Sequence, residues 1–153
     1  MSLLSEESIE TFIELTFSSC HLQEFIFSED RYKNDLIFKE NFWSNQLKLW
    51  LEYIRKDLTC ICPDLIREIN YFSIGLQLTN NFTIKELNEK WRQKSVETDV
   101  LSFPVFDENL VLPDNHSTEL GDIFVSLPMA HKQALEQNHQ LSFELRWLVS
   151  HGL

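Results

Sequence analysis

The residues that could do chemistry in this 153-residue chain lie in its second half. Lys90, Arg92 and Lys94 form the densest basic cluster, with three cations in five positions, and His151 lies three residues from the end. By spacing alone, the cations suit the C-terminal end of a helix, where the helix dipole favours positive charge. A lone histidine near an apolar helical stripe usually has a structural role. Spacing therefore leaves both features with a simple structural interpretation.

Several other chemistries are not supported by the sequence. With only Gly75, Gly121 and Gly152, the chain has no glycine-rich phosphate-binding loop, and no GxSxG nucleophile elbow is present. The cysteines at positions 20, 60 and 62 are odd in number and show no CxxC spacing. They indicate reduced thiols rather than a disulfide framework or a cysteine zinc site.

The bulk composition indicates one globular, cytoplasmic domain. Hydrophobic residues make up 43% of the chain, which is typical of a protein with a buried core. No apolar run approaches the length of a membrane span, and the N-terminus lacks the pattern of a signal peptide. The net charge of −11 argues against a nucleic-acid-binding protein, although a local basic patch on an acidic body remains compatible with one.

In the first half, residues 9–17 alternate between apolar and polar side chains and predict a half-buried strand. Residues 18–35 carry no recognisable chemistry; Cys20 and His21 are interpreted as a surface pair. A long amphipathic helix is expected from Asn41 to Leu58. Its buried face would hold Trp43, Leu47, Trp50, Leu51, Ile54 and Leu58, and its solvated face Lys48, Glu52, Arg55 and Lys56.

In the second half, a strand is expected over residues 72–79. A capping box at Thr83 and Glu86 would start a helix that ends near Arg92. The buried stripe of that helix would be Ile84, Leu87 and Trp91. After the helix, the sequence predicts a strand at 100–103, a loop at 105–118, a strand at 120–126, a helix from Pro128 and a turn at 138–140. A last helix would carry Leu141, Leu145, Leu148 and His151 on its inward face. This interleaving predicts an α/β (α+β) fold with a mixed sheet of about four strands packed with helices.

A pattern that runs through the second half resembles a known family. It consists of Trp91-Arg92, the run TDVLSFP at residues 98–104, LGDI at 120–123 and His151-Gly152-Leu153. Order and spacing are similar to the YbeY family of zinc-dependent endoribonucleases, which mature ribosomal RNA. The resemblance covers residues 68–153 well, and before that only the strand–helix–strand order agrees.

The resemblance implies roles for four residues. In this family the last motif runs H-G-x-x-H-x-x-G-x-D-H, and its three histidines bind one Zn²⁺ on the last helix. His151 matches the first ligand. Arg92 matches a family arginine whose implied role is to bind phosphate or stabilise negative charge at phosphorus. Lys90 and Lys94 would help to hold RNA. The zinc would lower the pKa of a water molecule that attacks the phosphodiester.

The chain departs from the family pattern at its end. The second and third zinc ligands are absent from these 153 residues, and His116, His131 and His139 do not match the motif. The expectation is a single YbeY-like domain over residues 1–153 whose C-terminal end is missing, either as a truncated form or as a degenerate product. Asp99, Asp122 and Ser102 are expected to shape the sheet edge, and Asp122 could also support a ligand histidine.

The implied function is single-strand-specific, metal-dependent endoribonuclease activity in ribosomal RNA maturation and ribosome quality control, with the small ribosomal subunit as partner. One alternative is a non-catalytic ribosome- or RNA-binding adaptor, because the zinc ligand set is incomplete. A zinc peptidase is less well supported, since Gly152 stands where the HExxH motif has its glutamate. A purely structural acidic domain would leave the matched motifs unexplained.

Overall fold

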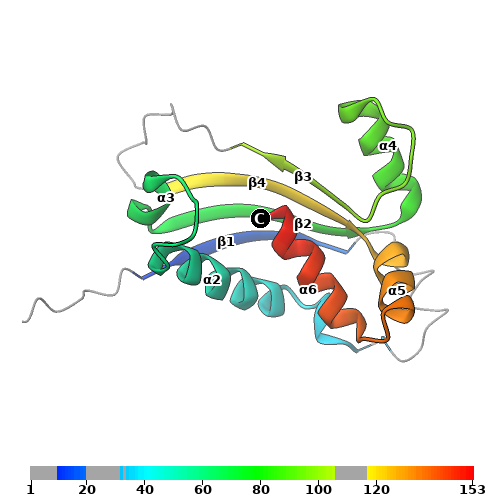
Figure 1. Cartoon of the computed structure of the whole chain (residues 1–153), viewed down its shortest axis with the longest axis horizontal. Coiled ribbons are helices and arrows are strands. Elements are labelled where there is room, and N and C mark those ends of the chain that lie inside the picture. The colour runs from blue at the N-terminus through cyan, green and yellow to red at the C-terminus, as the bar shows by residue number, and fades with distance from the viewer. Residues whose placement is uncertain (1–9, 20–31, 33, 106–116) are drawn as a thin grey trace, which may run out of the picture.

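The computed structural model describes residues 10–19, 32, 34–105 and 117–153, over which strands and helices are interleaved (Figure 1). In chain order the elements are β1 (Phe12–Ser18), the 3-10 helix η2 (Leu36–Phe38), α2 (Glu40–Lys56), α3 (Asp64–Glu68), β2 (Tyr71–Thr79), α4 (Asn81–Arg92), β3 (Val100–Pro104), β4 (Ser117–Ser126), α5 (Leu127–Glu136) and α6 (Leu141–Gly152). Within the described residues, no helix is both long enough and apolar enough to cross a membrane.

The four strands form one mixed sheet in the order β1-β2-β4-β3. β1 and β4 both pair with β2 in parallel, and β3 pairs with β4 in the antiparallel direction. The predicted α/β fold with a mixed four-stranded sheet is therefore confirmed. Parallel neighbours need crossover connections, which α2 and α3 provide between β1 and β2, and α4 with β3 provides between β2 and β4.

The main core lies between one face of the sheet and helices α2, α5 and α6. Alternate residues of β2 and β4 point into it, among them Leu76, Leu78 and Val125, each no more than 1% exposed. The core residues of α2 and α6 repeat every three or four positions, which gives each helix one apolar stripe. Trp43 of α2 is fully buried, and its indole N–H donates to the carbonyl of Ile37 at 2.8 Å.

Helix α4 packs against the opposite face of the sheet, near β3. Leu101 and Phe103 of β3 face the same way as their partners in β4, because directly opposed residues of an antiparallel pair share a face. Trp91 of α4 contacts Phe103 with ring centroids 6.1 Å apart, and Phe103 contacts Phe124 at 5.7 Å. The sheet thus has helices on both faces, with α4 beside the β3 edge (Figure 1).

Helix α2 differs from its predicted form at its C-terminal end. It ends at Lys56, so Leu58 lies beyond it and is 86% exposed, and its expected place in the core was wrong. Arg55, expected on the solvated face, is only 9% exposed. Its guanidinium donates to Thr11 Oγ1 at 2.7 Å and to Asn70 Oδ1 at 3.3 Å, and burial lowers the pKa of Arg55. A buried cation with neutral hydrogen-bond acceptors cannot be recognised from helical periodicity.

Helix α4 starts three residues earlier than predicted. The Asn80 side chain accepts from the Thr83 amide at 2.8 Å, so Asn80 is the N-cap and Thr83 lies within the first turn. The predicted Thr83–Glu86 capping box is therefore wrong, whereas the predicted end at Arg92 is confirmed. Trp91 was expected to be buried and is 61% exposed.

The remaining predicted elements are largely confirmed. Pro128 lies in the first turn of α5, and residues 137–140 connect α5 to α6. The short helix α3 was not expected, because five residues give too short a repeat for its period to be seen. Cys20, His21 and residues 106–116 of the expected loop lie outside the described residues.

The cap assignment predicts the effect of two matched substitutions. Asn80→Ala should lower the free energy of unfolding by about 1 kcal/mol, because the Thr83 amide loses its acceptor. Thr83→Ala, which would remove the cap of the predicted capping box, should change it by less than about 0.5 kcal/mol. Urea unfolding followed by circular dichroism measures both, and a larger effect at Thr83 would contradict the assignment.

Candidate functional site

Arg92 lies beside β3, the outer strand of the sheet among the described residues. The backbone carbonyl of Asp99 accepts from the Ser126 amide at 2.8 Å, and the Val105 amide donates to the carbonyl of Leu120 at 3.2 Å. The odd-numbered residues of β3 therefore turn their backbone N–H and C=O groups toward β4. The carbonyl of Ser102 therefore points away from β4. Arg92 Nη2 donates to this carbonyl at 3.2 Å. The guanidinium is exposed, and its other N–H groups are available to a ligand.

The turn after α4 arranges the basic cluster around Arg92. Gln93 takes a left-handed conformation with φ of 57°, and its amide donates to the carbonyls of Asn88 and Glu89. The buried Asn88 side chain donates to the carbonyl of Val96 at 3.0 Å and holds the following segment against the helix. Lys90, in the last turn of α4, and Lys94, just after the helix, are both exposed. The periodicity of α4 gave no indication that Asn88 has this role.

His151 projects from the outer side of α6. It was expected on the inward face and is exposed, so this prediction was wrong. The inward face runs through Leu145, Leu148 and Val149, and Gly152 continues it toward Ile123. The His151 ring lies 4.5 Å from the Trp147 ring, and Nδ1 lies 2.9 Å from the Trp147 carbonyl oxygen. A protonated Nδ1 donating to this carbonyl leaves Nε2 as the atom that can bind a metal.

Ser102 connects Arg92 to the end of α6. Below the last turn of α6 is a small hollow of about 30 Å³, lined by residues 102–104 of β3, 120–123 of β4, Ile74, Gly152 and Leu153. Arg92 binds the Ser102 carbonyl, while Ser102 itself borders this hollow. The two most important predicted residues, Arg92 and His151, thus belong to elements that converge on the middle of β3.

The aspartates of the matched motifs have structural roles in this region. Asp99 accepts from the Val100 amide at 2.8 Å and from Gln133 Nε2 at 3.1 Å, which ties the start of β3 to α5. Asp122 pairs with Gly75 across β2 and β4, and its carboxylate occupies the space that a side chain at Gly75 would fill. Asp122 lies on the sheet face opposite α6, as its pairing with Phe103 shows, so it does not support the His151 ring.

The described residues do not by themselves hold a zinc ion. A catalytic zinc site needs three protein ligands, and no group of three histidine, cysteine, aspartate or glutamate side chains occurs among residues 10–19, 32, 34–105 and 117–153. His139 bonds the Glu144 carboxylate at the turn between α5 and α6, and His131 lies edge-on to Tyr32. His116 lies outside the described residues. Among the described histidines, His151 is thus the exposed one that could bind a metal.

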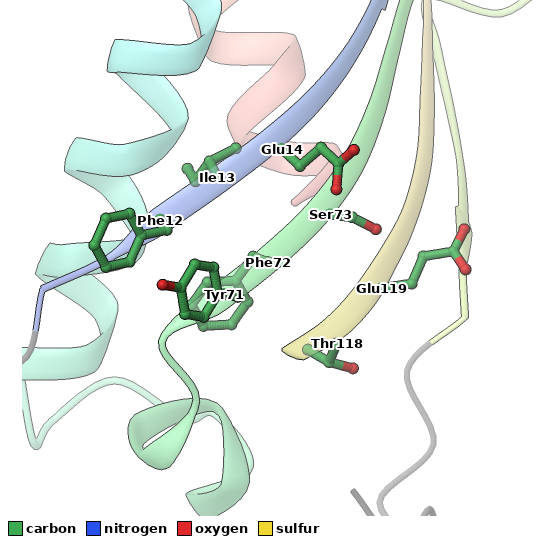
Figure 2. A pocket seen from close by; sticks show the side chains of 8 residues that line it. All are labelled: Phe12, Ile13, Glu14, Tyr71, Phe72, Ser73, Thr118 and Glu119. Atoms are coloured by element: carbon green, nitrogen blue, oxygen red, sulfur yellow. The ribbon is translucent and has the colours of Figure 1, made fainter. Parts of the chain in front are cut away.

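A wider hollow of about 680 Å³ lies at the other end of the sheet and contains none of the predicted site residues. Figure 2 shows the stacked rings of Phe12 and Tyr71, with centroids 4.7 Å apart, and the carboxylates of Glu14 and Glu119 on either side of Ser73. These carboxylates repel phosphate groups. This end of the sheet is therefore a poor surface for RNA.

The family of the chain follows from comparison with known proteins. A family model described as "Endoribonuclease YbeY" matches residues 30–153. The chain belongs to the YbeY family. Relatives named Endoribonuclease YbeY include one from Prochlorococcus marinus strain MIT 9211, 44% identical over 97% of this chain and 76% of the relative, and one from strain MIT 9313, 53% identical over 72% and 59%. A third, from Synechococcus sp. strain CC9311, is 40% identical over 92% and 80%.

The predicted YbeY resemblance is thereby confirmed, together with the expected class of activity, an endoribonuclease and so a hydrolase. The chain spans 59–80% of the length of these three YbeY relatives. The solution structure of a Thermotoga maritima protein aligns with a TM-score of 0.49 and 24% identity over 91% of this chain and 69% of that one.

The contact between Gly75 and Asp122 predicts a rescue experiment. Gly75→Ala should lower the free energy of unfolding by about 1–3 kcal/mol, because the new Cβ would lie 1.9 Å from Asp122 Oδ1. Asp122→Ala in the same chain should restore most of that loss by clearing the space. Thermal unfolding of the two single variants and the double variant measures the coupling. Additive effects would contradict this contact.

Proposed function

We propose that this YbeY-family protein is a metal-dependent endoribonuclease that cleaves single-stranded RNA, and that Arg92 binds the phosphate that is attacked. The observation that carries the proposal is the position of the Arg92 guanidinium. It is exposed, and it is anchored by one hydrogen bond to Ser102 of β3, the strand that borders the end of α6. Ribosomal RNA maturation and ribosome quality control, with the small ribosomal subunit as partner, are the proposed setting.

The chemistry proposed for Arg92 follows from its geometry. A guanidinium offers two parallel N–H groups to two phosphate oxygens, and its charge stays in place at any physiological pH. Because the Ser102 carbonyl already orients it, little side-chain freedom is lost when phosphate binds. Negative charge that builds up on the phosphate oxygens during attack is then stabilised. Lys90 and Lys94 add attraction for the RNA backbone without reading its sequence.

The metal part of the proposal rests on one residue of this chain. His151 Nε2 would be one ligand of a zinc ion, and two further histidines would have to come from residues after Leu153, as the family motif implies. Bound zinc would supply Lewis-acid chemistry at the phosphodiester. With one ligand in hand, the described residues support no further step. The cytoplasm is the proposed location, since Cys60 and Cys62 are both free thiols.

A non-catalytic RNA- or ribosome-binding adaptor is the second candidate. The basic cluster favours it, because an exposed arginine and two exposed lysines can bind RNA without a metal. The zinc peptidase and the purely structural domain receive no support from the family assignment.

Arg92→Ala should lower the rate of RNA cleavage by about 10²–10³-fold, the usual loss when one group that stabilises a transition-state anion is removed. The assay is cleavage of a labelled single-stranded RNA by zinc-loaded protein that includes the residues after Leu153. Lys132→Ala, which removes an exposed cation on α5, is the matched control and should leave the rate unchanged. Equal rates for Arg92→Ala and the control would refute the role of Arg92.

The metal proposal predicts two zinc stoichiometries. The 153-residue chain should bind zinc weakly and below one ion per chain, whereas a chain that continues through the family motif should bind one ion tightly. His151→Ala in the longer chain should remove most of the bound zinc, as measured by elemental analysis after dialysis. Absence of zinc from the longer wild-type chain would leave the adaptor as the better account.

A further inference from the structure

The indole of Trp91 is more exposed than its sequence pattern explains. It follows Ile84 and Leu87 in the apolar stripe of α4, yet 61% of the residue is exposed. Trp43 shows what a core tryptophan looks like in this fold, with full burial and a hydrogen bond from its indole N–H. Leaving a large aromatic ring in water gives up most of the free energy that its burial would contribute. Trp91 therefore contributes less to the core than its position in the stripe suggests.

The Trp91 ring is nevertheless held in a defined place. Its edge meets Phe103 at 6.1 Å with an interplanar angle of 63°, and Phe103 in turn meets Phe124 at 5.7 Å and 81°. Such edge-to-face contacts hold an aromatic ring more specifically than apolar contact alone. Phe103 and Phe124 belong to the paired strands β3 and β4, so the sheet itself supports the ring. An exposed ring with a fixed support is suited to stacking with a flat ligand.

Positive charges lie close to this ring in space or in sequence. Lys90 Nζ lies 5.1 Å from the ring centroid, and Arg92 is the next residue along the chain, bound to the Ser102 carbonyl beside Phe103. Glu89 is the nearest acidic neighbour in sequence and accepts a hydrogen bond from Ser95 Oγ at 3.2 Å. Proteins bind single-stranded nucleic acids with aromatic rings that stack on the bases and nearby cations that bind the phosphates.

We propose that Trp91 is a stacking platform for one base of the single-stranded RNA whose phosphate binds Arg92. This inference rests on the proposed function and adds a specific contact to it. Stacking on an indole tolerates every base, because each base has a π-face. The site would therefore select unpaired nucleotides over a duplex, in which bases are already stacked on one another. It would not select a particular sequence.

The distribution of charge elsewhere on the sheet supports this location. The wide hollow at the other end of the sheet carries Glu14 and Glu119 and repels a phosphate chain. Helix α4, which carries Trp91, follows the C-terminal end of β2, whereas the hollow lies at the start of β2 (Figure 1). A strand of RNA that is kept from the acidic end by repulsion would meet the cations and the Trp91 ring at the α4 end.

The test is binding of a labelled single-stranded oligonucleotide with 2′-O-methyl riboses, which resists cleavage, to the full chain at one fixed salt concentration. Trp91→Ala should raise Kd by about tenfold, the effect expected for loss of one base–aromatic stack. Trp91→Phe should keep Kd within about threefold of the wild type, because a smaller ring still stacks. Phe82→Ala removes another exposed aromatic residue of α4, 69% exposed, and should leave Kd unchanged.

Abasic nucleotides, placed at one position of the oligonucleotide at a time, give a second measurement that needs no correctly folded alanine variant. An abasic nucleotide at one of these positions should weaken binding to the wild type by about tenfold. The same oligonucleotide should show little further loss of affinity with Trp91→Ala. If circular dichroism shows that Trp91→Ala is unfolded, the comparison is made with Trp91→Phe, for which the loss should be smaller than for the wild type. Trp91→Ala that binds like the wild type while Arg92→Ala binds weakly would overturn the stacking role and leave the proposed function standing. Absence of binding by the wild type would overturn both.

Discussion

The antiparallel pairing of β3 with β4 is the constraint on which the arrangement of the candidate site depends. It makes β3 an edge strand, and it turns the Ser102 carbonyl outward, where Arg92 binds it. The pairing also places Phe103 on the face of α4, with Trp91, whereas Ser102 lies on the opposite face, with Ile123. A shift of β3 by one residue would exchange these two faces, because successive side chains of a strand point in opposite directions.

Gly121 allows this pairing to form. Its φ of 120° lies in a region that side chains rarely adopt, and a Cβ there would lie 2.2 Å from the Phe103 carbonyl oxygen. Just before it, the register between β2 and β4 shifts by one residue between Ser73 and Ile74. The shift re-aims the rest of β4, so that Asp122 covers Gly75 on one face and Ile123 meets Gly152 on the other. The glycines of the matched motifs are thus explained by close packing.

An acidic protein that binds RNA must separate its charges. The net charge of −11 counts the whole chain, but interactions between exposed charges fade beyond about 10 Å at moderate salt. Lys90, Arg92 and Lys94 lie together at one end of the sheet, and Glu14 and Glu119 face the hollow at the other. The bulk charge therefore says little about the α4 end, where the local cations act over a short range.

The sequence by itself determined the order of most elements and the family, because hydrophobic periodicity and a run such as TDVLSFP are local properties that need no contacts to be read. It also indicated Arg92 and His151 as the residues to examine. Only the tertiary structure decided that Arg55 is buried, that Asn80 rather than Thr83 caps α4, and that Trp91 and His151 are exposed. Burial at the ends of helices depends on which neighbours pack there, and those neighbours are distant in the sequence. That is why Arg92 and His151 could be singled out from the sequence, whereas their exposure and their contacts could not.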